Sequence, residues 1–400
     1  MLRNEAAVRR RARQRIGKCS SPAALLLLLL TACTTAYQPP VPVHGSSTFP
    51  GLIDVVAEAN GRPLDVIVVH GMCTHDVAWA NKAIDGLINA MDRNLTREAP
   101  ETTFKSLTAE PIEVVERTAH TPAGTIHFSA PVWSPLTTPL KRQLAYDATG
   151  TPTDCSAPGD CRPTRARLNG KLKDKLLNDC LADAMIYQGD SRDGIRSAMV
   201  ETIASVLQKS TARARAAGVA PGPFVVVSSS LGSKLAFDAL EALVLGADGT
   251  EASRAMGRES INRLAVLFMQ ANQLPILGLA DQQAIQARDA LEGASEIDQN
   301  DSLQRILRLH AQKPPAIRSD NSQPVLSLVA FTDPNDLLSY RLQPSRYAVP
   351  GIAIADVLVS NAPTYLGLLA RPDTAHTAYD SNPAVATLIS CGLPKSKRCR

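Results

Sequence analysis

The sequence predicts an α/β fold with a mostly parallel central sheet and helices on both faces. Short β-branched apolar runs recur along the chain, and stretches with helical periodicity separate them. Because consecutive parallel strands need a crossover connection, this alternation favours helices on both sides of one sheet. The predicted strands cover 64–69, 111–120, 125–131, 223–227, 264–268, 325–331 and 352–359, and the predicted helices cover about 76–95, 172–186, 195–207, 235–245, 281–311 and 383–389.

Length and composition are those of a folded protein. The chain has 400 residues, of which 44% are hydrophobic, which is enough for one large domain or two modest ones. Its formal net charge is +4, but the first 32 residues hold seven basic side chains and one acidic one, which leaves −2 for the rest. A chain without clustered positive charge on its folded part is not expected to bind nucleic acid.

The N-terminus has the pattern of an export signal. A basic stretch precedes residues 22–32, which include six consecutive leucines. A membrane-spanning helix needs about 20 apolar residues, so this run is too short to be an anchor. It ends in the letters LTAC, with the cysteine at Cys33, and this resembles the lipobox of bacterial lipoproteins. The resemblance implies a signal peptide over 1–32 and an acylated Cys33; an ordinary cleavage site with an incidental cysteine is the alternative.

The lipoprotein resemblance also implies a location and a domain plan. Thr34, and not an aspartate, follows Cys33, which in enteric-type lipoproteins goes with outer-membrane sorting. We therefore expect a lipid-anchored protein of the bacterial cell envelope, on the outer membrane and facing the periplasm. Residues 33–60 contain four prolines and are predicted to be the lipidated cysteine and an extended linker, followed by a folded domain over 61–400.

Six cysteines follow the predicted lipidation site. An even number in an exported protein favours disulfides. The two close pairs suggest the bridges Cys155–Cys161 and Cys391–Cys399, which leaves Cys73 and Cys180. Neither close pair has the C-x-x-C spacing of a zinc site, and no histidine lies near them in the sequence, so no metal site is predicted.

The strongest chemical motif follows the predicted strand 223–227. There an apolar strand runs into consecutive serines and then into a helix, with Gly232 two residues after Ser230. This resembles the nucleophile elbow G-x-S-x-G of α/β-hydrolases, in which a sharp turn lifts the serine hydroxyl above the sheet. Ser228 stands where that family has its first glycine. Ser229 and Ser233 are rivals, but Ser230 has a small residue two positions before and two after it, and we predict that it is the nucleophile.

A second motif of the same family follows the strand 64–69. His70 and Gly71 stand where α/β-hydrolases place their second oxyanion donor. By this resemblance the donors are the backbone amides of Met72 and Leu231. Each such amide stabilises the developing negative charge by about 3–4 kcal/mol. His70 itself is interpreted as a residue that orients the loop.

The acid and the base of a catalytic triad have candidates further along the chain. Asp333 and Asp336 both follow the strand 325–331; the second resembles the acid loop of bacterial lipases and is favoured. His376 is the one histidine that follows them. A serine hydroxyl needs an imidazole to accept its proton, and a carboxylate fixes the tautomer of that imidazole. The order serine, aspartate, histidine is that of α/β-hydrolases.

These motifs predict a carboxylesterase-like serine hydrolase that acts on a small acyl-ester or lipid-like substrate through an acyl-serine intermediate. No dinucleotide fingerprint or P-loop occurs in the sequence, and no cofactor is predicted. The charged stretch over about 134–200 is predicted to be an inserted, lid-like region, with Asp179 and Asp183 in structural roles. The residues indicate no oligomeric state. The alternative function is a non-catalytic envelope-binding or scaffolding lipoprotein that retains the hydrolase fold.

Overall fold

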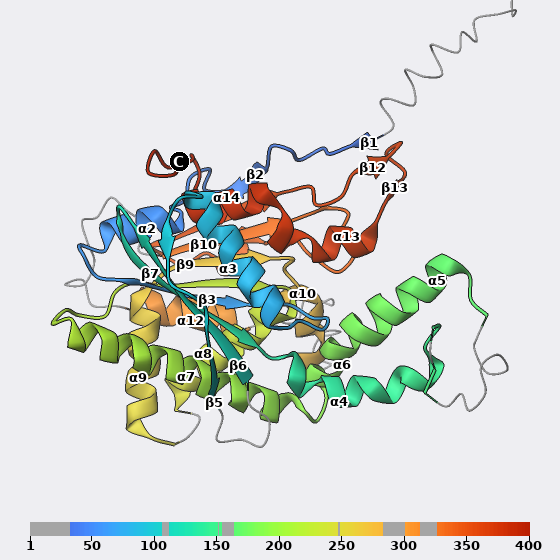
Figure 1. Cartoon of the computed structure of the whole chain (residues 1–400), viewed down its shortest axis with the longest axis horizontal. Helices are drawn as coiled ribbons and strands as arrows, with labels where there is room; N and C mark the ends of the chain where they lie inside the picture. The colour runs from blue at the N-terminus through green and yellow to red at the C-terminus, as the bar shows by residue number, and fades with distance from the viewer. Residues whose placement is uncertain are drawn as a thin grey trace, which may run out of the picture.

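A computed structural model describes residues 33–105, 112–150, 152–153, 164–246, 249–282, 301–312 and 326–400. At its centre lies a ten-stranded sheet with helices around it (Figure 1). The prediction of an α/β fold is confirmed at this level. The strands of the sheet are β2 (Val41–Gly45), β3 (Leu64–Val69), β4 (Thr96–Arg97), β5 (Glu101–Lys105), β6 (Ile112–Thr121), β7 (Gly124–Val132), β8 (Phe224–Ser229), β9 (Leu264–Gln270), β10 (Leu326–Thr332) and β11 (Ile352–Leu358).

The sheet is mixed, so the prediction of a mostly parallel sheet is wrong at both edges. The strand order is β2-β11-β10-β9-β8-β3-β7-β6-β4, and β5 pairs with β6. From β11 to β7 all neighbours are parallel. The edge strands β2, β4, β5 and β6 add antiparallel pairs. A tight turn joins β6 to β7, and such a short connection can only join antiparallel neighbours.

The predicted linker is partly folded. Strand β2 pairs antiparallel with β11, and Pro42 lies opposite Val357 in that pairing. Proline is tolerated there because an edge strand has one side without a partner strand. The helix α2 (Leu52–Glu58) follows and buries four of its apolar side chains. The folded body therefore includes β2 and α2, although both lie within the range 33–60 that the sequence predicts to be an extended linker.

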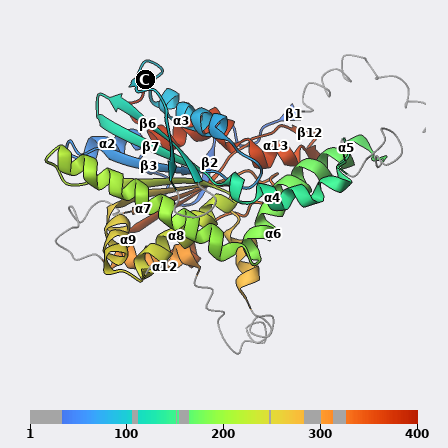
Figure 2. The ribbon, with the colours of Figure 1, turned by 60° about the horizontal axis from the view of Figure 1, so that its bottom comes forward.

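Helices cover both faces of the sheet (Figure 2). One face packs against α2, α3 (Val77–Met91) and α14 (Pro383–Cys391), and the other against α7 (Arg192–Ala216), α8 (Leu231–Leu245), α9 (Glu251–Arg263) and α12 (Ser302–Ala311). In β8, Val225 and Val227 belong to the first core and Val226 to the second. Because both faces are buried, residues 224–227 of this strand are all apolar and do not alternate with polar residues.

A helical excursion connects β7 to α7 and corresponds to the predicted inserted region. It consists of η1 (Ser134–Leu136), α4 (Thr138–Lys141), η2 (Arg142–Asp147), α5 (Arg167–Lys171), the π-helical η3 (Leu172–Leu181) and α6 (Ala182–Gln188). In Figure 1 its helices extend to the right of the sheet, on the same side as α13 (Pro372–Thr377). The excursion is therefore positioned near the ends of the strands that lead into the candidate site.

A second, small sheet lies beside α13. Its strands are β1 (Cys33–Thr34), β12 (Thr364–Tyr365) and β13 (Leu369–Ala370), in the order β1-β12-β13. The remaining short elements are α10 (Leu274–Leu277), η4 (Gly278–Asp281), η6 (Pro344–Tyr347) and η7 (Tyr379–Ser381). Of the predicted helix over 281–311, residues 301–312 are described and contain α12, whereas 283–300 lie outside the described residues.

Two disulfides are present in the described part of the chain. Cys391 pairs with Cys399, which confirms that prediction. Cys73 pairs with Cys180, the two residues that the sequence left over. The predicted pair Cys155–Cys161 lies outside the described residues. None of the described helices is both long and apolar enough to cross a bilayer.

Candidate active site

Ser230 occupies a sharp turn between β8 and α8. Its backbone angles are φ 53° and ψ −128°, a conformation that non-glycine residues rarely adopt. Holding it costs about 1–3 kcal/mol, and such strain occurs mostly at functional sites. The residue is 2% exposed, and its amide donates a hydrogen bond to the carbonyl of Gln270 at 2.8 Å. The turn therefore fixes the hydroxyl at the carboxyl end of β8.

Small residues allow the close approach of backbone around this turn. A methyl group added at Gly232 would lie 2.1 Å from the carbonyl oxygen of His70, and one added at Gly71 would lie 2.8 Å from the Ser230 Cβ. Real Cβ atoms do not approach other atoms so closely, so both positions require glycine. The two glycines of the predicted motifs thus serve one contact, between the loop after β3 and the start of α8.

The Ser228 hydroxyl has two hydrogen-bond partners, although the elbow motif has glycine at this position. Its buried Oγ lies 3.0 Å from the Ser233 Oγ and donates to the Phe268 carbonyl at 3.3 Å. A buried hydroxyl costs free energy only when it lacks hydrogen bonds. A serine in place of glycine is therefore compatible with the turn.

Ser230, His376 and Asp336 form a chain of hydrogen bonds. The Ser230 Oγ lies 3.3 Å from the His376 Nε2, and the His376 Nδ1 lies 2.9 Å from both carboxylate oxygens of Asp336. All three side chains are buried. When the Nδ1–H donates to the carboxylate, the neutral ring offers the Nε2 lone pair to the serine hydroxyl. This is the geometry of a nucleophile, a base and an orienting acid.

Asp333, the rival acid, has other partners. Its Oδ1 accepts the amide of Asn335 at 2.9 Å, and its Oδ2 accepts the amide of Asn361 at 2.6 Å. The first contact is the Asx turn common for aspartate in loops. Asp333 therefore ties two loops together, while Asp336 is the aspartate that contacts the His376 ring.

Tyr379 is a site residue that the sequence reasoning missed. Its hydroxyl accepts the amide of Asp333 at 2.7 Å and donates to the Asp336 Oδ2 at 3.2 Å. Burial, and next the nearby Asp336 carboxylate, raise the pKa of Tyr379 well above its usual range, so the phenol stays protonated and donates. Only its place three residues after His376 marks it in the sequence, and a core aromatic residue would have the same pattern.

Two asparagines position the short helix α13, which contains His376. The Asn361 side chain donates to the Ala375 carbonyl at 2.9 Å. Asn382 donates to the Asn361 side-chain oxygen at 2.8 Å. Because Asn361 also donates its amide to Asp333, one hydrogen-bond network links the acid loop to the helix of the base.

The backbone amides of Met72 and Leu231 are available as donors. Within the described ranges, neither amide donates a hydrogen bond to another protein atom. Leu231 is the first residue of α8, where the amides have no acceptor within the helix and the positive end of the helix dipole lies. These amides have the properties that oxyanion donors need.

His70 orients the loop that contains Met72. It is fully buried; the Trp133 amide donates to its Nε2 at 3.0 Å, and its Nδ1 lies 2.7 Å from the Gly71 carbonyl. The ring also stacks on Trp133, with centroids 4.7 Å apart. Burial, and next the neighbouring His75, lower the pKa of His70 well below its usual range, so the ring is neutral and its proton is on Nδ1.

The helical excursion holds the next residues of this loop. The Cys73 amide donates to Asp183 at 2.8 Å, and the Thr74 amide donates to Asp179 at 3.1 Å. The ammonium group of Lys141 lies 3.1 Å from Asp183 and 2.8 Å from Asp179. Burial raises the pKa of Asp183, and the positive charge of Lys141 partly offsets this by lowering the same pKa. The two aspartates thus accept amides of the loop that follows Met72 and hold it against the helical excursion.

Removing the Cys73–Cys180 disulfide should lower about tenfold any reaction rate that depends on the position of the Met72 amide. The bridge joins the residue after Met72 to η3, and partial misplacement of an amide worth 10²–10³ in kcat accounts for roughly this loss. The test is kcat for p-nitrophenyl acetate in the Cys73→Ser, Cys180→Ser double variant, at a temperature where circular dichroism shows it folded. The matched control is Cys391→Ser with Cys399→Ser. Equal kcat in both double variants would contradict the prediction.

The cavity beside Ser230 is small. Its volume is about 30 Å³, and it is lined by Gly71, Met72, His75, Ser229, Ser230, His376, Thr377, Tyr379 and Asp380. A space of this size holds about one water molecule. A larger group could reach the Ser230 hydroxyl only if the lining side chains moved.

Asp380 and His75 add two titratable groups to this cavity. The Asp380 carboxylate accepts a hydrogen bond from the Trp79 indole at 2.9 Å. Burial raises the pKa of Asp380 and lowers the pKa of His75. Both shifts favour the neutral forms, which is the effect of a poorly hydrated site.

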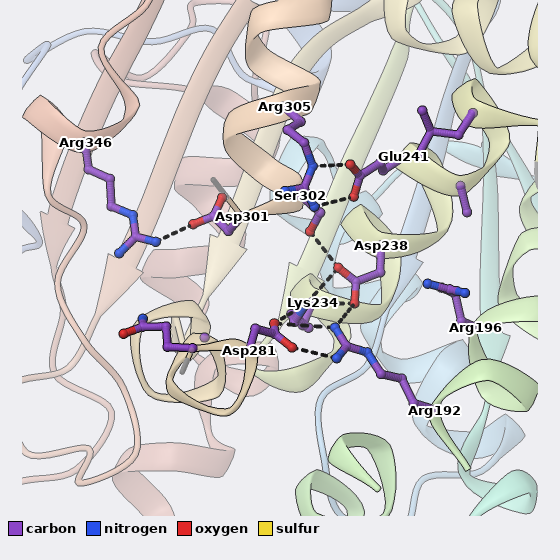
Figure 3. Close-up of a pocket in the computed structure, with 14 residues that line it drawn as sticks. Arg192, Arg196, Lys234, Asp238, Glu241, Asp281, Asp301, Ser302, Arg305 and Arg346 are labelled. Carbon is purple, nitrogen blue, oxygen red and sulfur yellow. Dashed lines mark hydrogen bonds and ion pairs between the residues drawn. The ribbon is translucent and has the colours of Figure 1, made fainter. Parts of the chain in front are cut away.

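A larger pocket of about 450 Å³ lies along α8 and includes none of the triad residues (Figure 3). Its side chains are mostly charged, and the labelled cations are paired. Arg192 lies 2.6 Å from Asp281, Lys234 lies 2.8 Å from Asp238, Arg346 lies 3.0 Å from Asp301, Arg196 lies 2.9 Å from Asp193, and Arg305 pairs with Glu241. We interpret this network as one that fixes α8, the helix that begins after Ser230.

Comparisons with protein-family models, curated proteins and solved structures found no match to this chain. No group of three or more metal-ligating side chains occurs within the described ranges.

Proposed function

We propose that this protein is a serine hydrolase of the α/β-hydrolase type with carboxylesterase-like activity. The observation that carries the proposal is the buried hydrogen-bond chain from Ser230 through His376 to Asp336. The strained turn at Ser230 adds support, because a fold does not retain such strain without a compensating interaction or a function.

The proposed reaction has two halves. The Ser230 Oγ attacks the ester carbonyl carbon while His376 Nε2 takes its proton, and the amides of Met72 and Leu231 bind the oxyanion. The tetrahedral intermediate then collapses, the C–O bond to the alcohol breaks, and His376 returns the proton to the leaving oxygen. Water attacks the acyl-serine with His376 again as the base, and the carboxylic acid leaves as Ser230 regains its proton. Asp336 holds the imidazole and stabilises its charged form throughout.

We further propose that the enzyme is a lipoprotein of the bacterial envelope. Acylation of Cys33 would anchor the chain, with the outer membrane as the expected location. We propose a small acyl ester or a lipid-like ester as the substrate, on the basis of the same Ser230, His376 and Asp336 that would perform the reaction. A non-catalytic envelope-binding role is the second candidate, and the small size of the cavity at Ser230 favours it.

Labelling with a fluorophosphonate tests the activity. This probe phosphonylates an activated serine, so wild type should be labelled and Ser230→Ala should not. Ser229→Ala is the matched control, because among the described residues it is Ser230, and not Ser229, whose hydroxyl is hydrogen-bonded to His376. This variant should be labelled like wild type. Labelling of Ser230→Ala would contradict the assignment of Ser230 as the nucleophile. An unlabelled wild type would favour the binding role.

A further inference from the structure

The hairpin of β12 and β13 exposes a cluster of apolar side chains. Leu366, Leu368 and Leu369 are 67%, 85% and 69% exposed, and Tyr365 is 44% exposed. These four residues occupy four of five consecutive positions, and Gly367 is the fifth. Single exposed leucines are ordinary on protein surfaces, whereas a contiguous exposed apolar group marks an interaction site. We call residues 365–369 the apolar hairpin.

The backbone of the apolar hairpin is costly for the residue at its tip. Leu366 has φ 54° and Gly367 has φ 67°, and the Leu368 amide donates to the Tyr365 carbonyl at 3.0 Å. This two-residue turn needs positive φ at both central positions, for which asparagine and glycine are preferred. A leucine there is strained and also exposed, so neither folding nor solubility accounts for it.

The proposed lipidation site lies directly against the apolar hairpin. In the small sheet Cys33 is paired with Tyr365, and Thr34 with Thr364. The side-chain hydroxyl of Thr364 also donates to the Thr34 carbonyl at 3.0 Å. Both views place β1 and β12 together beside α13 (Figures 1 and 2). An acyl group on Cys33 would therefore enter the membrane next to the exposed leucines of the apolar hairpin.

We infer that the apolar hairpin inserts among the lipids of the bilayer that anchors Cys33, and that the enzyme hydrolyses esters of membrane lipids. This inference rests on the proposed function. Acyl chains alone fix where a protein is attached but not which face it presents, while apolar side chains in the interface add a second contact. The pairing of β1 with β12 places the two contacts side by side and so sets the orientation of the body.

The same hairpin leads directly into the candidate site. β13 ends at Ala370, and α13, with His376, begins two residues later. The acid loop adds another exposed apolar side chain, Leu337, which is 72% exposed and follows Asp336. Docking of the hairpin would therefore bring the loop of the base toward the membrane surface, where esters of membrane lipids are the available substrates. The acid loop is tied to that loop by the contact of Asp336 with His376.

Tryptophan quenching tests the docking. The full chain, purified from membranes and reconstituted in vesicles, is compared as Leu368→Trp and Leu245→Trp, two substitutions of exposed leucines in different places. Brominated phosphatidylcholine should quench the added emission of Leu368→Trp at least about twofold and leave that of Leu245→Trp unchanged. Equal quenching of the two variants, or none in Leu368→Trp, overturns the docking, whatever the enzyme hydrolyses.

A comparison of substrates tests the lipid ester. The variant Leu366→Asn, Leu368→Ser, Leu369→Ser has a better turn residue at its tip and should fold. It should hydrolyse pyrene-labelled phospholipid in phosphatidylcholine vesicles about tenfold more slowly than wild type and p-nitrophenyl acetate within about twofold of it. Leu245→Ser should match wild type on both. Equal vesicle rates in the triple variant and wild type overturn the inferred substrate class.

These readouts separate the inference from the proposed function. An unlabelled, inactive wild type overturns the hydrolase and with it the lipid ester, while quenching still decides the docking. The mass of the N-terminal peptide reports acylation directly, and Cys33→Ala shows whether the anchor is needed for quenching. Quenching of Leu368→Trp that survives Cys33→Ala supports the hairpin as a membrane contact and overturns its dependence on the anchor.

Discussion

Replacing Asp336 with asparagine should lower kcat for p-nitrophenyl esters about 10⁴-fold. The carboxylate accepts the Nδ1–H of His376 at 2.9 Å with either oxygen. An asparagine amide group facing that nitrogen would donate, which favours the tautomer with the proton on Nε2. That proton would point at the Ser230 hydroxyl, and the imidazole could no longer accept from it. The defect lies in the chemical step, so single-turnover acylation should slow by the same factor.

Asp333→Asn is the matched control for this prediction. Its oxygens accept amides from Asn335 and Asn361 and do not contact the imidazole. The substitution turns one acceptor into a donor that faces an N–H group, which costs about 1–3 kcal/mol of stability. We expect a lower Tm and a kcat within about tenfold of wild type. A larger kcat loss in Asp333→Asn than in Asp336→Asn would identify Asp333 as the acid.

Much of the sheet could be predicted because its central strands are buried on both faces. Runs such as that of β8 are apolar and β-branched, and both cores use them. Whether two strands pair parallel or antiparallel could not be predicted in the same way. It depends on which strands are neighbours in the sheet, and the residue pattern of a single strand does not show this. The edge strand β2 was missed because its prolines are typical of a linker, and only its contact with β11 distinguishes it.

In the candidate site, too, features with a local sequence pattern could be predicted and contacts between distant segments could not. Ser230 and Gly232 could be found because a strained turn needs small residues at fixed spacing. The choice between Asp333 and Asp336 could not be made from spacing, since the two lie on one loop and tertiary contacts direct only one toward His376. Tyr379 and the pairing of Cys73 with Cys180 were missed for the same reason. Contacts between distant segments have no local pattern.

The charge network along α8 is the second place where a large effect is expected. Asp238 is its centre, and its oxygens accept hydrogen bonds from Lys234 at 2.8 and 2.9 Å, from Ser302 at 2.7 Å and from Tyr187 at 2.8 Å. The Lys234 side chain is 5% exposed and lies 3.4 Å from Asp281, its other carboxylate partner. Burial, and next Asp238, raise the pKa of Tyr187, so its hydroxyl remains a donor.

Asp238→Asn should lower the free energy of unfolding by about 3–5 kcal/mol, because it leaves the buried Lys234 ammonium without its nearest counter-charge. Urea unfolding followed by circular dichroism measures the change. Glu241→Gln is the matched control on the same helix; its partner Arg305 is 44% exposed, so the loss should be under about 1 kcal/mol.

The double variant Lys234→Met, Asp238→Asn separates charge from packing. If the cost of Asp238→Asn is the unpaired charge, removing the lysine should restore most of the stability, since a buried pair adds little over apolar side chains of similar volume. Lys234 lies one helical turn after Ser230, so kcat of the same variants also shows whether the turn at Ser230 is disturbed. Restored stability together with wild-type kcat would assign the network to folding alone. Restored stability with a persistent loss of kcat would mean that the network also fixes the start of α8, and with it the Leu231 amide.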